Sequence, residues 1–144
     1  VPIRPFVQSN SNAYYFARGQ KMRIKDAKNL NALYNLRDDE KSLSPDDLWS
    51  RSVLKKLEEL DATEKEELAA SQFSSDKMRV LDSLSLRQVM EQAGLSPEAI
   101  EMLATAYSSE TMLDSAVTET IREEWKQVWS LKFDEIVGGT DKMA

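Results

Sequence analysis

The sequence contains no cysteine and no histidine. It therefore offers no thiolate metal ligand, no cysteine nucleophile and no imidazole for acid–base chemistry. No apolar run approaches the roughly 18 residues that a membrane-spanning helix needs. Only 4 glycines and 4 prolines occur in 144 residues, which argues against disorder and against an all-β sandwich. These absences exclude several classes of site before any motif is considered.

The composition that remains is typical of a globular protein, with 41% hydrophobic and 31% charged residues. A chain of this length fits one domain and can bury a sizeable core. The formal net charge is −6, and no stripe of basic residues is visible. This balance argues against nucleic acid or an anionic membrane as a partner. The compartment stays open between secreted and cytoplasmic, because proteins without disulfides occur in both.

Residues 1–25 have a β pattern. The short run Ile3–Gln8 is interrupted by Pro5, which suits a sheet edge. Two further runs, Ala13–Ala17 and Lys21–Lys25, flank a glycine-containing turn and predict a hairpin. Because an isolated hairpin is marginally stable in water, we expect this region to join a larger sheet.

Residues 26–130 predict a helical region, an irregular bundle of about five or six helices. Its helices should begin where a capping side chain precedes a proline, an acid or a glutamine. The expected starts are Asp26, Ser44-Pro45, Thr63 with Glu66, Ser85 with Gln88, and Ser96-Pro97, with Gly94 ending the fourth helix. The expected apolar faces are Trp49, Val53, Leu57 and Leu60; Ile100, Leu103 and Ala104; and, in a last helix from Met112 to Trp129, Leu113, Val117, Ile121, Trp125 and Val128.

Loops are expected at 37–44 and around 74–76. The acidic groups at 38–40, 46–47 and 64–67 lie at loops or helix starts, where negative charge is locally favourable, so we interpret them as solvated faces and caps rather than as acid pairs.

An aromatic set could line a ligand funnel, but at helical spacing it more often forms core. Its members are Trp49, Tyr107, Trp125, Trp129 and Phe133. Three aromatic residues follow one another at Tyr14, Tyr15 and Phe16. We expect two of them to pack against the rest of the protein and one to face outward.

The segment 131–144 predicts a strand, a turn and the start of a helix. Gly138 and Gly139 can adopt backbone angles closed to other residues and allow close approach of another group. Thr140 is a suitable N-cap for the helix that follows. The sequence ends at Ala144, about one turn into that helix, and a single turn is not stable alone. We therefore expect the chain to be a piece of a longer protein.

The same segment resembles a motif of the flavin-dependent amine oxidases, most closely their L-amino-acid oxidase branch. The resemblance runs from Phe133 to Gly139 and continues with Asp141-Lys142. Other pieces agree in order along the chain, with a loose middle between residues 61 and 82. They are Phe6-Val7-Gln8, Ala13–Phe16, Leu48–Leu60 and Gly94–Ala99.

The resemblance implies that the chain is the helical part of a substrate-binding domain, in a processed chain or a fragment. The complete enzyme would be an oxidoreductase that uses FAD to convert L-amino acids to keto acid, ammonia and hydrogen peroxide. Thr140 and Lys142 would face the substrate cavity, and Gly138 and Gly139 would form a turn near the flavin. No residue here matches a catalytic, FAD-binding or metal-binding position, so we expect the chain alone to bind no FAD and to be inactive.

The partners implied are the remaining chains or domains of the same flavoenzyme, an L-amino acid and further copies in a homo-oligomer. The alternative from the residues alone is a free-standing helical protein-interaction module. Such a module would have the same composition and the same number of helices as a segment of an oxidase. The hairpin without a sheet and the short last helix argue against it.

Overall fold

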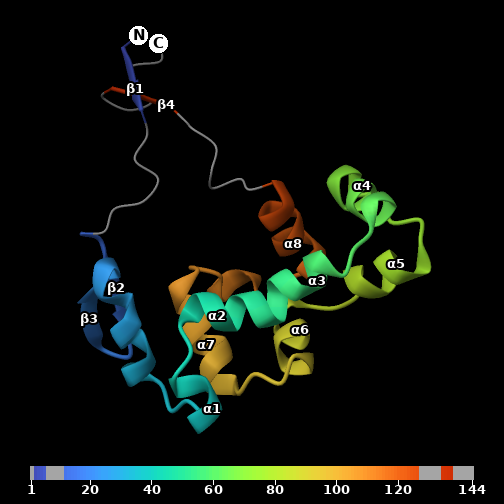
Figure 1. Cartoon of the computed structure of the whole chain (residues 1–144). Coiled ribbons are helices and arrows are strands. Elements are labelled where there is room, and N and C mark those ends of the chain that lie inside the picture. The colour runs from blue at the N-terminus through green and yellow to red at the C-terminus, as the bar shows by residue number, and fades with distance from the viewer. Residues whose placement is uncertain (1, 6–11, 127–133, 138–144) are drawn as a thin grey trace.

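The computed structural model describes residues 2–5, 12–126 and 134–137 (Figure 1). The protein is mostly helical and carries an N-terminal hairpin, as the sequence predicts. The α-helices are α1 (Asp38–Lys41), α2 (Pro45–Trp49), α3 (Lys55–Glu58), α4 (Ala62–Ala70), α5 (Asp76–Asp82), α6 (Leu86–Gln92), α7 (Pro97–Ala106) and α8 (Val117–Lys126). Two 3₁₀ segments, η1 (Ile24–Leu33) and η3 (Glu110–Met112), and one π segment, η2 (Ser50–Leu54), complete the helical part.

Four short strands form two separate antiparallel pairs. They are β1 (Ile3–Pro5), β2 (Tyr14–Ala17), β3 (Gln20–Arg23) and β4 (Asp134–Ile136). The β2–β3 pair is the expected hairpin. Its turn residues Arg18 and Gly19 have φ values of 50° and 74°, the positive angles that a two-residue hairpin turn requires.

The two faces of the hairpin differ in burial. Ala17 is buried, and the Tyr15 hydroxyl donates to the Ala106 carbonyl oxygen over 3.1 Å, so this face packs against α7. Tyr14 and Phe16 lie on the other face and are 46% and 76% exposed. The prediction that two of these three aromatic residues pack is therefore wrong. Side chains alternate along a strand, so residues 14 and 16 must share a face.

The β1–β4 pair joins the two ends of the described chain. Ile3 is opposite Ile136, and the Val137 amide donates to the Pro2 carbonyl oxygen over 3.0 Å. In Figure 1 this pair is drawn away from the helices. The strand expected before the two glycines is thus confirmed, and its partner is the first strand of the chain.

The core is one continuous cluster of buried apolar side chains that reaches from the hairpin to α8. The apolar face predicted for α7 is confirmed, because Ile100, Leu103 and Ala104 are at most 2% exposed. Trp49, Val53 and Leu60 are also buried, whereas Leu57 is only partly buried. The amphipathic pattern therefore predicted most of the core correctly.

Three of the expected helix starts are confirmed by cap hydrogen bonds. Ser44, Ser85 and Ser96 each accept a bond from the backbone amide three residues later, over 3.1–3.2 Å. Gly94 follows α6 with a φ of 81°, the left-handed conformation that ends many helices. The local signals were sufficient because each cap satisfies an amide that the helix itself cannot bond.

Two other expected starts are wrong. Asp26 lies inside η1 with non-helical angles, and Arg23 precedes that segment. The capping box of α4 is formed by Asp61 and Glu64, not by Thr63 and Glu66. Each carboxylate of this box accepts the other residue's backbone amide over 2.9 Å. Asp is at least as good an N-cap as Thr, and here it begins the helix two residues earlier.

The last helix and one expected loop also differ from the predictions. α8 begins at Val117 rather than Met112, which lies in η3, and Trp125 is 44% exposed rather than part of the buried face. The segment expected as a loop at 37–44 contains α1. The loop expected around 74–76 is confirmed at residues 72–75, and Asp76 begins α5 behind a Ser75 cap. Val128 and Trp129 lie outside the described residues.

Candidate functional site

The four residues that the sequence singles out for function lie outside the described part of the structure. They are Gly138, Gly139, Thr140 and Lys142. The strand that leads to them is described, and it is held by β1. Their assignments therefore stay predictions.

Within the described residues, a group of aromatic and acidic side chains joins α2, the end of α7 and α8. The rings of Trp49 and Tyr107 stack at a centroid distance of 4.3 Å and an angle of 23°. The indole N–H of Trp49 donates to Oε1 of Glu124 over 2.7 Å. The hydroxyl of Tyr107 donates to Oδ1 of Asp46 over 2.5 Å. We call these four residues the aromatic–acid cluster; it ties three helices together.

Burial raises the pKa values of two residues of this cluster, Tyr107 and Glu124. It raises the pKa of the Tyr107 hydroxyl above its ordinary value, and the hydrogen bond to Asp46 raises it further. Burial also raises the pKa of Glu124, against the hydrogen bond from Trp49, which favours the ionised form. Tyr107 is therefore a neutral hydrogen-bond donor at physiological pH. The cluster can orient groups and fix shape, and it places no nucleophile beside a base.

The five aromatic residues that were expected to form core or to line a funnel differ in burial. Trp49 is 4% exposed and belongs to the core. Tyr107 packs against the core and is partly buried. Trp125 is on the surface, with the Lys65 ammonium 5.1 Å from its ring. Trp129 and Phe133 lie outside the described residues.

Glu40 is a fully buried carboxylate that the sequence interpretation missed. Its oxygens accept the Ser96 backbone amide (2.8 Å), the Ser96 hydroxyl (2.6 Å) and the Arg37 backbone amide (3.0 Å), and the Arg37 guanidinium lies 3.1 Å away. Burial by itself would raise the pKa of Glu40, but the hydrogen bonds from Ser96 and Arg37 outweigh it and lower the pKa. Glu40 thereby joins α1 to the first turn of α7.

The interpretation of the acidic groups as solvated faces and caps is confirmed for the cap role of Glu40 and Glu64, which accept the backbone amides of residues 37 and 61, but neither residue is solvated. Glu40 is inaccessible, and Glu64 is 9% exposed and lies 2.7 Å from the Lys77 ammonium. The sequence carried a signal for the cap in each case, though not for the burial. Each glutamate stands three residues after the residue that precedes a helix, where it can accept that residue's amide.

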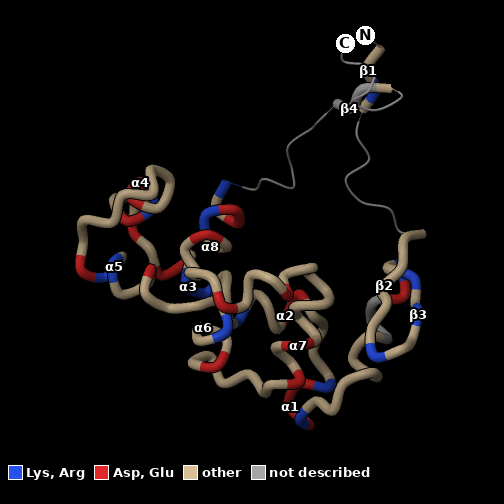
Figure 2. Tube along the Cα trace, turned by 180° about the vertical axis from the view of Figure 1, so that it is seen from behind, with Lys and Arg blue, Asp and Glu red and all other residues tan. Residues whose placement is uncertain are grey.

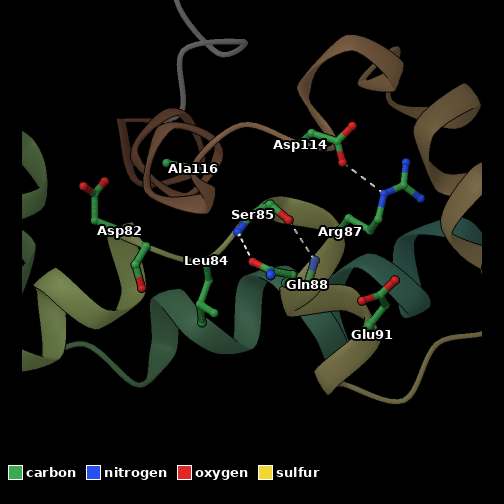
Figure 3. A pocket seen from close by; sticks show the side chains of 9 residues that line it. Asp82, Leu84, Ser85, Arg87, Gln88, Glu91, Asp114 and Ala116 are labelled. Carbon is green, nitrogen blue, oxygen red and sulfur yellow. Dashed lines mark hydrogen bonds and ion pairs between the residues drawn. The ribbon is translucent and has the colours of Figure 1, made fainter.

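Figure 3 shows a hollow of about 540 Å³ between the start of α6 and the segment before α8. Arg87 Nε lies 3.1 Å from Oδ1 of Asp114 across it, and the Ser85 amide donates to the Gln88 side-chain oxygen over 2.9 Å. The labelled polar groups thus bond mainly to one another and do not converge on a common point. We assign no chemistry to this hollow.

Residues 2–5, 12–126 and 134–137 contain no group of three or more acidic side chains placed to hold a metal ion. No helix in the part of the chain that the structure describes is long and apolar enough to cross a membrane.

Comparison with known proteins connects the chain to L-amino-acid oxidases. The L-amino-acid oxidases of Sistrurus catenatus edwardsii and Crotalus adamanteus are 27% identical to it, and that of Pseudechis australis is 25% identical. Each alignment covers 99% of this chain but only 26–27% of the relative, so the chain spans about a quarter of the length of these relatives. No known family profile matches the chain. The similarity supports an L-amino-acid-oxidase-related family.

Proposed function

We propose that this chain is the helical part of the substrate-binding domain of an FAD-dependent L-amino-acid oxidase. The observation that carries the proposal is the similarity to such oxidases along 99% of the chain. The complete enzyme would oxidise L-amino acids to keto acid, ammonia and hydrogen peroxide, and further copies would form a homo-oligomer. The matched segment would contribute to the walls of a funnel that leads the substrate to the flavin.

The described residues do not fit as an FAD site. A dinucleotide is usually held at a glycine-rich turn between a strand and a helix, where backbone amides meet the pyrophosphate. Gly19 and Gly94 are the glycines of the described ranges; one lies in a hairpin turn and the other ends a helix. The flavin would therefore be bound by other parts of the enzyme, and this chain would supply shape and exclusion of water.

The aromatic–acid cluster suits such a supporting role. It fixes α2, the end of α7 and α8 relative to one another through a ring stack and two short hydrogen bonds. A substrate passage needs walls that hold their position, because misplaced reactants react slowly. The cluster would hold these walls without touching the reacting atoms.

The proposed division of the chain follows the same argument. Residues 1–25 would be an edge strand and a hairpin of a larger sheet, 26–130 a helical subdomain, and 131–144 the strand and turn that approach the flavin. The exposure of Tyr14 and Phe16 on the outer face of the hairpin supports a covering sheet or segment there.

The first experiment asks what accompanies this chain. Purification of the native protein that contains it should yield further polypeptide and flavin absorbance. The 144-residue chain alone, mixed with FAD, should not quench flavin fluorescence. Tight FAD binding and amino-acid turnover by the isolated chain would refute the proposal.

The second experiment tests the turn in the complete enzyme. Gly139→Val should lower flavin occupancy or turnover, because a branched side chain strains a turn that needs unusual angles. Lys142→Ala should alter KM or substrate preference more than Tm. Lys41→Ala, which changes an exposed side chain of α1, is the matched control and should change neither. Wild-type kinetics in both turn variants would make this turn purely structural.

A helical interaction module is the second candidate, and one observation favours it. The core is continuous from Ala17 to Ile121, as in a unit that folds by itself. A single colourless polypeptide from the native source, bound to an unrelated protein, would support this alternative over the oxidase.

A further inference from the structure

The outer face of the β2–β3 hairpin carries two aromatic and two cationic side chains. Tyr14 is opposite Arg23 and Phe16 is opposite Lys21 in the strand register, so these four residues share one face. Phe16 is 76% exposed and Tyr14 is 46% exposed, whereas the other face of the hairpin packs against α7. We call these four residues the cation–aromatic face.

Neither cation of this face has an ion-pair partner among the described residues. The Lys21 ammonium lies 4.1 Å from the centroid of the Tyr14 ring, and the central carbon of the Arg23 guanidinium lies 5.5 Å from it. Arg23 also donates to the Asn12 side-chain oxygen over 2.9 Å. Both cations are thus held beside Tyr14 by neutral groups, and no acid of the described residues neutralises them.

The distribution of charge decides which kind of partner fits this face. Residues 1–25 contain five of the 19 basic residues and no acid, so the remainder holds 14 basic and 25 acidic residues. A nucleic acid or an anionic membrane presents an extended negative surface, which that remainder would repel. A protein segment that covers only this face avoids the repulsion, and a carboxylate on it would complement the two cations.

The aromatic rings require an apolar group beside that carboxylate. Aromatic residues and arginine are enriched where protein surfaces meet, because their rings lose contact with water there. Alternate residues of a strand lie about 7 Å apart, and this spacing separates the Phe16–Lys21 pair from the Tyr14–Arg23 pair. A partner with an apolar side chain and an acid at the same spacing would therefore cover Phe16 and reach Arg23 together.

We propose that a segment of the same enzyme, outside residues 1–144, covers the cation–aromatic face with at least one carboxylate and one apolar side chain. The carboxylate pairs with Arg23 and Lys21, and the apolar side chain packs on Phe16. The alignments cover only 27% of the first two relatives, so most of such an enzyme lies outside this chain. The inference rests on the proposed function, because it takes the partner from the complete enzyme.

Carbodiimide cross-linking of the native protein that contains this chain tests the chemistry of the partner. The reagent joins an amine to a carboxylate in contact with it, with loss of water. After digestion, mass spectrometry should find Lys21 joined to an Asp or Glu outside residues 1–144. Lys41, which lies 2.7 Å from Asp38, is the internal control and should be joined to it.

Other cross-linking results would overturn the proposal. Lys21 joined to an acid within residues 1–144 would assign the face to a second copy. Lys21 that is not joined, whether or not it is protected from an amine reagent, would exclude the carboxylate. Protection of Lys21 by an added oligonucleotide or by anionic vesicles, without a cross-link in the native protein, would assign the face to a polyanion.

Hydroxyl-radical oxidation tests the cover over the rings. Tyr14 and Phe16 should react about tenfold more slowly in the native protein than in the 144-residue chain, because a covered ring reacts only when the contact opens. Lys21→Glu brings like charges together and should restore about half of the lost reactivity or more. Lys55→Glu makes the same change at another exposed lysine, on α3, and should restore none. Equal protection in both variants would refute the role of charge; circular dichroism confirms that each is folded.

These measurements are separate from the test of the oxidase itself. Flavin absorbance and amino-acid turnover report the proposed function, whereas the cross-link and the oxidation rates report only the hairpin. A flavin-containing oxidase in which Lys21 and Phe16 are as reactive as in the 144-residue chain would refute this inference alone. A protein without flavin or turnover in which Lys21 is joined to an outside acid would refute the proposed function alone.

Discussion

The hairpin end and the helical body of this chain differ in charge and in burial. Residues 1–25 hold basic side chains and no acid, so all 25 acidic residues follow them. Figure 2 shows blue on the β2–β3 hairpin and both red and blue segments along the helices. The helical body buries its apolar residues in one cluster, whereas the hairpin leaves Phe16 76% exposed. The helical body has a complete core, and the hairpin has one covered face and one open face.

Direct contacts connect the two regions across this charge boundary. The Arg18 guanidinium lies 2.8 Å from both Glu98 and Glu101 on α7. It also stacks over the Tyr34 ring at 4.4 Å. The exposed pairs contribute little individually, but together with Tyr15 and Ala17 they orient the hairpin on α7. The inner face of the hairpin therefore belongs to the helical body, and the outer face does not.

The largest expected effect comes from the core of the helical body. Ile121→Ala should lower the free energy of unfolding by about 2–5 kcal/mol, because Ile121 is fully buried and truncation leaves a cavity. Leu57→Ala should have a smaller effect, since Leu57 is only partly buried. Urea denaturation measures both.

Glu119→Ala, on the same helix as Ile121, is the control for this comparison. Its side chain is partly exposed and pairs with Arg122, so the change should be about 0.5 kcal/mol or less. If Ile121→Ala and Glu119→Ala had equal effects, the assignment of a buried and an open side to α8 would be wrong.

The next effect concerns the buried carboxylate. Glu40→Gln should lower stability at neutral pH by about 1–3 kcal/mol, because it weakens a set of hydrogen bonds inside the protein. The pKa of Glu40 is lowered on folding, so its contribution is complete above the ordinary carboxyl pKa and is lost as pH falls through the lower folded value. The difference between wild type and Glu40→Gln should therefore shrink in acid. A difference independent of pH would contradict this account.

These residues show how far the sequence could predict the structure. Local signals predicted the Ser44, Ser85 and Ser96 helix starts, because an N-cap acts within three residues. Periodicity predicted the buried face of α7. The burial of Glu40 could not be predicted, because its partner Ser96 is distant in sequence. The π segment η2 was missed for a related reason, since no local propensity distinguishes it from α-helix.

The candidate site was predictable only in part. The strand before the two glycines was recognised from its sequence, but its partner β1 is far away along the chain. The aromatic–acid cluster joins residues up to 75 positions apart, as in the bond between Trp49 and Glu124. Trp125 was assigned to the core because it follows the helical period, yet tertiary packing leaves it exposed. Side-chain partners of this kind depend on the arrangement of helices, not on local pattern.

A smaller effect of opposite sign is expected at Glu124. Its pKa is raised on folding, so ionisation lowers stability as pH rises from the ordinary carboxyl value to the folded value. Glu124→Gln keeps an oxygen for the Trp49 indole and removes the charge. It should leave stability at neutral pH unchanged or raise it by about 0.5 kcal/mol.

The matched control is Glu91→Gln on α6, an exposed carboxylate that loses the same charge. Thermal melts from acid to neutral pH should show Glu124→Gln gaining relative to wild type as pH rises, and Glu91→Gln following wild type. The opposite pH trends of the Glu40 and Glu124 variants would then separate a hydrogen-bonded carboxylate from a desolvated one.

The smallest effect on stability should occur on the outer face of the hairpin, and it gives the sharpest test of the comparison. Phe16→Ser removes a large aromatic group, yet it should change the free energy of unfolding by about 0.5 kcal/mol or less, because the ring is mostly in water. Tyr15→Phe removes one oxygen atom, but it breaks the bond to the Ala106 carbonyl and should lower stability by about 0.5–1.5 kcal/mol.

The order of these two variants should reverse in the complete enzyme if the outer face is covered there. Phe16→Ser would then remove an interface contact and lower the Tm or the yield of assembled enzyme more than Tyr15→Phe does. Melting curves of both variants, recorded for the 144-residue chain and for the assembled enzyme, provide the measurement. If Phe16→Ser stayed neutral in both, the outer face would be an ordinary exposed surface, and the argument for a covering sheet would fail without affecting the helical body.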